Sequence, residues 1–159
     1  MHRGFLILLH IVIVSFLVLG FVNGKAQFAA GYLALYLGIL FVSRMVRIKA
    51  YEQSFFFAAI AIGFSARLFD LYRIPLYDKG LHTVVPLLIA LALSAKWPKR
   101  KFFIFLIVLS LGLIWEGIEF TAQSLFTGYS MGTGLDTLGD IGCNAIGATL
   151  GLLKRRAPG

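Results

Sequence analysis

Hydrophobic positions in this chain form long, nearly uninterrupted runs, and short polar breaks separate one run from the next. A membrane-spanning helix needs about 20 mostly apolar residues, and such a segment must satisfy its backbone hydrogen bonds internally. Each run is therefore expected to form a spanning helix. The predicted spans are Gly4–Val22, Gln27–Val42, Ser54–Phe69, Asp78–Ala95, Phe102–Gln123 and Asp136–Leu153. The pattern predicts an all-α fold, a polytopic membrane bundle of six transmembrane helices that forms a single domain over residues 1–159.

Composition supports a membrane protein and excludes several soluble classes. Hydrophobic residues make up 59% of the 159 residues and charged residues 14%, against roughly 45–50% and 25% in soluble domains. A soluble domain of this size cannot bury that much apolar surface. The single cysteine, Cys143, excludes an intrachain disulfide. The first apolar run is longer than the core of a usual signal peptide, so a membrane helix is favoured there.

The net charge of +8 would suggest nucleic acid in a soluble chain, but here the cations cluster where apolar runs end. Lys and Arg concentrate in the cytoplasmic loops of membrane proteins. With six spans, all but four of the 15 Lys and Arg residues fall on the side of the two termini. The other four are Lys25, Arg67, Arg73 and Lys79. We therefore expect both termini to be cytoplasmic. We expect the protein to lie in the cell (inner) membrane, with membrane lipids and not nucleic acid as its partners.

The acidic residues have the opposite distribution. All of the seven except Glu52 fall toward the non-cytoplasmic ends of the last four predicted spans, and these are Asp70, Asp78, Glu116, Glu119, Asp136 and Asp140. Ionisable side chains within spanning segments are costly, and they tend to face the bundle interior or water. Their concentration at one depth is the main functional signal in the sequence.

Helical spacing predicts that these acids form three polar stripes. Residues three or four apart lie on one helix face, so Asp78 aligns with His82, and Glu116 with Glu119. The stripe of Glu116 and Glu119 continues to Gln123, and the third stripe consists of Asp136, Asp140 and Asn144. In neighbouring antiparallel helices the stripes would meet near the outer leaflet.

Carboxylates and one imidazole suit a divalent cation, with magnesium, manganese, calcium and zinc not distinguished. We assign Glu116, Glu119, Asp136 and Asp140 as candidate metal ligands, and Asp78 and His82 as candidate catalytic residues. A plainer interpretation stays open, in which Asp78 and Asp136 are helix N-caps and His82 is a packing residue.

Basic and amide side chains nearby are candidates for substrate binding. Arg67, Arg73 and Lys79 could hold a phosphate, for which the guanidinium offers a matching fork, and the amides of Gln123 and Asn144 extend the polar stripes. The alternative for Arg67 is an ion pair with Asp70 at i+3 of the same helix.

Glycine is frequent in the sixth predicted span, where Gly147 and Gly151 form a GxxxG pattern. Small residues at this spacing allow close helix packing. The contact is expected either within the bundle or between protomers of a homo-oligomer.

The polar motifs resemble those of a known group. The runs Asp78-Lys79-x-x-His82, Glu116-x-x-Glu119 and Asp136-x-x-x-Asp140-x-x-x-Asn144 resemble the VanZ-like and YjdF-type families of small bacterial membrane proteins, over about Tyr77 to Gly151. VanZ-like proteins usually have glutamine where Glu119 stands. The resemblance implies a compact helical membrane bundle and an association of some members with the cell envelope, and it supplies no reaction.

Three classes of function follow from these observations. One is a metal-dependent enzyme or binding protein acting on a membrane lipid or lipid-linked phosphate. Another is a proton or divalent-cation transporter, and a structural or regulatory subunit with a buried polar network is a third possibility. A transport path needs ionisable groups at several depths, whereas here the acids gather on one side, so the sequence favours a one-sided pocket.

Overall fold

The computed structural model describes residues 2–74, 76–125 and 134–153, without the side chains of residues 2, 73, 122–125 and 134–135. Over these residues the chain forms six α-helices and the short 3-10 helix η1 (Leu71–Arg73). The α-helices are α1 (His2–Val22), α2 (Ala26–Met45), α3 (Ala50–Leu68), α4 (Tyr77–Lys96), α5 (Lys101–Leu125) and α6 (Gly134–Leu153). The all-α expectation is confirmed. α3 begins before the predicted Ser54 because the Glu52 carboxylate accepts the backbone N–H of Lys49 at 2.8 Å and caps the first turn.

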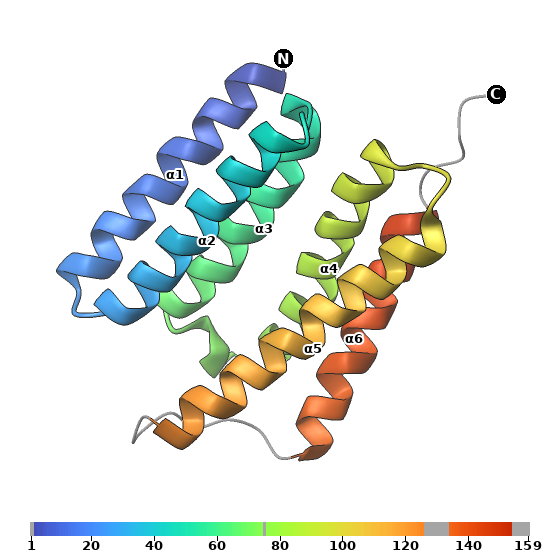
Figure 1. Ribbon diagram of the computed structural model, residues 1–159. Helices are drawn as coiled ribbons and strands as arrows, with labels where there is room; N and C mark the ends of the chain where they lie inside the picture. Colours follow the sequence, from blue (N-terminus) through green and yellow to red (C-terminus); the bar gives the residue numbers. More distant parts are fainter. Residues whose placement is uncertain (1, 75, 126–133, 154–159) are drawn as a thin grey trace.

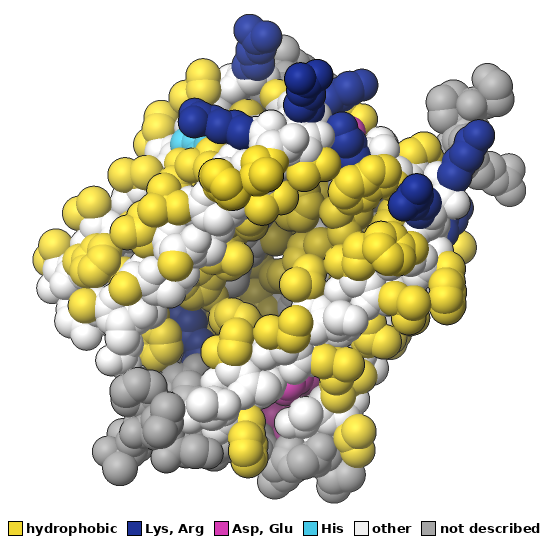
Figure 2. Space-filling view, in the orientation of Figure 1, with side chains coloured by type: hydrophobic (Ala, Val, Ile, Leu, Met, Phe, Trp, Pro, Cys, Tyr) yellow, Lys and Arg dark blue, Asp and Glu magenta, His cyan; other side chains and the backbone are white. Residues whose placement is uncertain are grey.

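Four of the helices, α1, α2, α4 and α5, are long and apolar enough to cross a membrane. Of the six spans expected from the sequence, these four are supported by length and composition. α3 and α6 have similar lengths of 19 and 20 residues. They fall short in apolar character because they carry Glu52 and Arg67, and Asp136 and Asp140, respectively. Many large hydrophobic side chains are exposed, and Figure 2 shows them spread over one face of the molecule, as expected for a surface in contact with lipid.

The helices form two groups, α1–α3 and α4–α6, and contacts between α3 and α4 join them (Figure 1). Lys and Arg side chains gather at the end of the bundle drawn at the top of Figure 2. We call this the basic end, and among the described residues it contains Arg3, Arg44, Arg47, Lys49, Lys96, Lys99, Arg100 and Lys101. The α1–α2 turn, η1 and the starts of α4 and α6 lie at the other end, which we call the acidic end.

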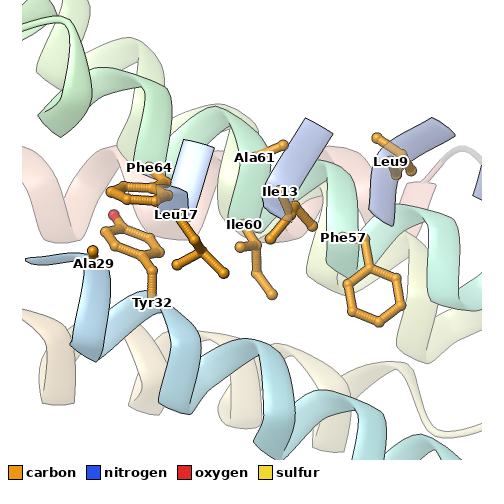
Figure 3. Close-up of a cluster of buried hydrophobic side chains, with 9 residues drawn as sticks. All are labelled: Leu9, Ile13, Leu17, Ala29, Tyr32, Phe57, Ile60, Ala61 and Phe64. Atoms are coloured by element: carbon orange, nitrogen blue, oxygen red, sulfur yellow. The ribbon is translucent and has the colours of Figure 1, made fainter. Parts of the chain in front are cut away.

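Each group has its own apolar core. In the first, Ile13 of α1 and Phe57 and Phe64 of α3 are fully buried, and Tyr32 of α2 stacks on Phe64 with ring centroids 4.5 Å apart (Figure 3). In the second, Ala90 of α4 meets residues of α5 and α6, and the full set is Ala90, Ile104, Val108, Ala148 and Leu152. The second core lies toward the basic end and leaves the acidic end of α4–α6 to polar side chains.

The contact between α4 and α6 depends on glycine. A Cβ atom added at Gly147 would overlap the backbone carbonyl of Thr83, and one added at Gly151 would lie 2.7 Å from both the Leu87 carbonyl oxygen and the Ala90 Cβ. The GxxxG pattern is therefore used inside the bundle, where small residues let two backbones approach closely. A homo-oligomer through α6 stays a prediction.

This contact predicts unequal effects of two similar substitutions in α6. Gly147→Ala forces α6 away from the Thr83 backbone, so we expect a loss of roughly 1–3 kcal/mol, as for other overpacked sites. Gly142→Ala is the matched control, because a Cβ there meets nothing within 4 Å, and alanine is the better helix former. Thermal unfolding in detergent should show a lower Tm for Gly147→Ala alone. Equal melting of the two variants would contradict the backbone contact.

Candidate functional site

His82 lies at the centre of a buried polar cluster at the acidic end. Its Nδ1 is 3.3 Å from the Asn144 Oδ1 and 3.6 Å from the Glu116 Oε1. Its Nε2 is 3.8 Å from the Asp78 Oδ1 and 3.9 Å from the Asp140 Oδ1. Each ring nitrogen thus faces two oxygens from two different helices. The three stripes on α4, α5 and α6 meet, as their spacing predicts.

Small and helix-distorting residues place these groups. Asn144 lies against α5 because position 112 is glycine, where an added Cβ would be 2.5 Å from the Asn144 amide nitrogen. Pro86 is inside α4, four residues after His82, and it has no N–H to donate to the His82 carbonyl. α4 therefore loses one helical hydrogen bond at the residue on which the cluster is centred.

Lys79 compensates two of the carboxylates. Its ammonium is 2.5 Å from the Asp136 Oδ1 and 2.6 Å from the Asp140 Oδ1, and it also donates to the Asp136 carbonyl at 3.1 Å. These contacts connect the first turn of α4 to the first two turns of α6. The charges of Asp136 and Asp140 are therefore partly neutralised by a residue assigned from the sequence to substrate binding.

A second ion pair connects the two helix groups. The Arg67 guanidinium of α3 donates to the Glu119 carboxylate of α5 at 2.5 Å, and it lies 4.2 Å above the ring centre of Tyr72. Burial raises the pKa of Tyr72 well above its usual value, so its hydroxyl stays protonated and the ring offers a neutral π face to the cation. Arg67 is thereby held against the cluster from the side of α3.

Asp70 belongs to the edge of this region. α3 ends at Leu68 and Asp70 adopts left-handed backbone angles (φ 53°, ψ 36°), so the i, i+3 helical geometry expected for Arg67 and Asp70 does not apply. Lys25 donates to the Asp70 carboxylate at 2.8 Å and to the carbonyls of Arg67 and Leu68. Asp70 is thus tied to Lys25, the residue before α2.

Burial increases from the rim of the cluster to its base. The side chains of Asp136 and Asp78 are 39% and 33% exposed, whereas those of His82 and Glu116 are each 8% exposed. The cluster is therefore open at the acidic end, and its base is shielded by the helices.

Two polar atoms at the base are unsatisfied. Among the described residues, the buried Glu116 Oε1 and the buried Asn144 Nδ2 have no hydrogen-bond partner, since 3.6 Å from His82 is too long for a hydrogen bond. Leaving a buried donor or acceptor without a partner costs about 1–3 kcal/mol, and more for a charged group. These atoms call for a further ligand or proton at the base of the cluster.

Two sets of side chains have a geometry that could hold a metal ion. Asp78, His82 and Asp140 form one, and His82, Glu116 and Glu119 form the other, and in each set the ligand atoms lie within 4.8 Å of one another. His82, expected as a catalytic residue, belongs to both sets. Asp136, expected as a metal ligand, belongs to neither.

The structure decides between several alternatives that the sequence left open. The N-cap of α4 is Leu76 and not Asp78. α6 begins at Gly134, so Asp136 lies in its first turn and is not the cap. The side chains of Arg73 and Gln123, both assigned to substrate binding, lie outside the described residues. The assigned roles of the site residues stay predictions.

Sequence reasoning missed Lys25, Tyr72 and Gly112. Lys25 pairs with Asp70 from 45 residues away, so no local spacing indicates it. Tyr72 is only five residues from Arg67, but it lies in η1 after the end of α3, so helical spacing does not indicate the contact. Gly112 carries a detectable signal, because it precedes Glu116 by one helical turn on the same face.

A helical bundle with four candidate spans and a buried acidic and histidine cluster at one end defines a multi-pass membrane protein. The chain belongs to the family described as predicted membrane protein (DUF2238), which matches residues 4–155. No curated protein and no solved structure matches the chain.

This match corrects the resemblance to the VanZ-like and YjdF-type proteins, which was wrong. The matching family covers all six helices, whereas the resemblance was based on short motifs in the C-terminal half. Asp, His and Glu at i, i+3 and i+4 recur wherever helices align polar side chains on one face, so these motifs do not identify a family.

The Arg67–Glu119 pair generates a prediction for double variants. Removing one partner of a buried ion pair leaves an uncompensated charge and costs on the order of 3 kcal/mol, so Arg67→Met and Glu119→Gln should each lower Tm. The double variant should be more stable than the sum of the two losses implies.

Asp70→Asn is the control for these measurements, because that carboxylate is 58% exposed, and exposed pairs contribute about 1 kcal/mol or less. Strictly additive losses in the double variant would show that Arg67 and Glu119 do not interact.

Proposed function

We propose that this membrane protein binds a divalent cation at its acidic end and, through that cation, a phosphate group of an envelope lipid. The observation that carries the proposal is the buried carboxylate oxygen of Glu116, which has no hydrogen-bond partner among the described residues and lies 3.6 Å from the His82 Nδ1. A cation between these two groups would satisfy both of them.

The ligands that support this proposal best are His82, Glu116 and Glu119. Their ligand atoms already lie within 4.8 Å of one another, and metal–oxygen and metal–nitrogen bonds of about 2.0–2.5 Å require only a small contraction. With the metal on Nδ1, the other ring nitrogen faces Asp78 and Asp140. A carboxylate next to the second nitrogen of a metal-binding histidine orients the ring and raises its basicity.

Charge balance favours a cation over a polar network alone. Asp136 and Asp140 share Lys79, and Glu119 has Arg67. Among the described residues, Asp78 and Glu116 share the imidazole of His82 as their ion-pair partner. Two carboxylates cannot both stay ionised in an apolar environment without compensation, and a divalent ion supplies that compensation.

The site supports one-sided binding over transport. Between the base of the cluster and the basic end, the interface of α4, α5 and α6 is filled by the core of Ala90, Ile104, Val108, Ala148 and Leu152. A path for protons or cations needs ionisable groups or water at several depths, and these five side chains provide neither.

A phosphate is the substrate class that suits the rim. Lys79 is 29% exposed beside Asp136, and a bound cation would add positive charge below it. The cation would polarise a phosphoryl oxygen, and Asp78, exposed at the rim, would serve as a base toward a nucleophilic water. The geometry supports binding of the phosphate more directly than its turnover.

We further propose that residues 1–159 form one transmembrane domain, with the basic end cytoplasmic and the site facing the opposite side. The distribution of Lys and Arg supports this orientation, since cytoplasmic segments are enriched in these residues. A site at the outer leaflet would meet lipid phosphates directly.

The metal proposal predicts a cation-dependent stability. Binding to the folded state alone stabilises it by about 2.7 kcal/mol at one hundred times the dissociation constant. Mn²⁺ should therefore raise the Tm of chelator-treated wild-type protein, and Glu116→Gln should remove most of that rise. Metal analysis of the purified protein should find a divalent ion in the wild type only.

Asp70→Asn is the matched control, because it removes an acid at the same end that contacts Lys25 and not His82. It should keep the full response to Mn²⁺. A wild type whose Tm does not respond to Mn²⁺ or chelator, with no ion on analysis, would refute the cation site.

The orientation can be tested with single cysteines in a Cys143→Ser background. Asn23→Cys lies in the α1–α2 turn at the acidic end, and Lys99→Cys lies in the α4–α5 connection at the basic end. A membrane-impermeant maleimide should label Asn23→Cys in intact cells and Lys99→Cys only after permeabilisation. The reverse pattern would invert the topology and place the site in the cytoplasm.

A further inference from the structure

A cavity lies toward the basic end of the molecule, between α2 and α3. Here α2 and α3 enclose an apolar cavity of about 290 Å³, lined among others by Gly38 and Val42 of α2, Phe56 of α3 and Ile48 of the connection between them. Gly38 and Val42 are exposed, so the cavity opens toward the membrane.

The cavity has one polar group, and it is unsatisfied. Ser43 lines the cavity and is 2% exposed, and within the described part of the chain its hydroxyl has no hydrogen-bond partner. Serine in a helix usually donates to the carbonyl four residues earlier, as Thr83 and Thr149 do here. Burying a hydroxyl without a partner is costly, so an acceptor from a bound molecule would satisfy Ser43.

Cationic residues lie close in the chain to the cavity end where Ser43 lies. Arg44 follows Ser43 directly, and Arg47 precedes Ile48, and both arginines are exposed. The Lys96 ammonium donates to the Arg47 carbonyl at 3.1 Å, which adds a third cation. The acid in this region, Glu52, is 1% exposed and accepts the Lys49 N–H, so it does not present its charge at the surface.

We propose that this cavity binds one acyl chain of an anionic phospholipid. The acyl chain lies along α2 past Gly38, and its ester carbonyl accepts a hydrogen bond from the Ser43 hydroxyl. The phosphate of the lipid lies among Arg44, Arg47 and Lys96. The order of groups along the cavity matches the order in a lipid, with apolar surface first, then a donor, then positive charge. Arginine is well suited to the phosphate because of its bidentate fork.

The cavity volume fits part of a lipid better than a complete small molecule. Pockets for drug-sized ligands usually occupy about 300–1,000 Å³ and enclose most of the ligand, whereas this cavity is at the lower limit and open on one side. An acyl chain needs only one face covered, because the surrounding bilayer covers the rest.

The test compares lipid adducts by native mass spectrometry of the full chain in detergent, with phosphatidylglycerol and phosphatidylcholine as probes. Gly38→Leu fills the cavity with little strain, because a Cβ there meets nothing within 4 Å. Gly31→Leu is the matched control, since it is an exposed glycine of the same helix with the same open surroundings and does not line the cavity.

Wild type and Gly31→Leu should retain phosphatidylglycerol in preference to phosphatidylcholine, and Gly38→Leu should lose that preference. Ser43→Ala, which changes no packing volume beyond one oxygen, should weaken phosphatidylglycerol binding about fivefold, the effect of one hydrogen bond. Equal retention in all four proteins would overturn the proposal. So would a dimer of the wild type that becomes monomeric in Gly38→Leu, because a second copy would then occupy the cavity.

Discussion

The polar cluster depends on how closely α6 approaches α4. Gly147 and Gly151 allow the backbone of α6 to touch the turns of α4 at Thr83 and Leu87. With the helices this close, Asn144 reaches His82, and Lys79 reaches two carboxylates one turn apart on α6. A side chain at Gly147 would push α6 away from α4 and so separate Asn144 from His82, and Asp136 and Asp140 from Lys79. The fold of α4–α6 and its site are consequences of one backbone contact.

Electrostatics then limits what the cluster can contain. Carboxylates taken out of water need compensation by cations, protons or hydrogen-bond donors. Lys79 and Arg67 provide it at the rim and at the α3 side, and both are residues that interact across helices. The base of the cluster, at Glu116 and Asn144, lacks such a partner among the described residues. The least compensated part of the cluster is therefore buried, with Glu116 7% and Asn144 2% exposed.

The sequence was a good guide to the helices and a partial guide to the site. Apolar runs predict all six helices because lipid-facing segments follow one simple rule of composition, and i, i+4 spacing predicts that His82, Glu116 and Asp140 meet. The partners of the cations could not be predicted. Arg67 and Glu119 are 52 residues apart, and Lys25 and Asp70 are 45 apart, and their pairing depends on which helices are neighbours. α3 and α6 are less apolar than the other four helices because they carry charged side chains that lie in the interior of the bundle.

Each end of the molecule has a buried polar group without a partner among the described residues, beside acidic side chains at one end and basic side chains at the other. At the acidic end, buried carboxylate without a partner favours a cation, and at the basic end a buried hydroxyl beside exposed arginines favours an anionic lipid. The apolar core of α4–α6 lies between the first end and the second and carries no charge. A ligand at one end therefore cannot act on the other by moving ions through the bundle. Any influence between the ends would have to pass through helix packing, and the Arg67–Glu119 pair is the described ion pair that joins α3 to α5.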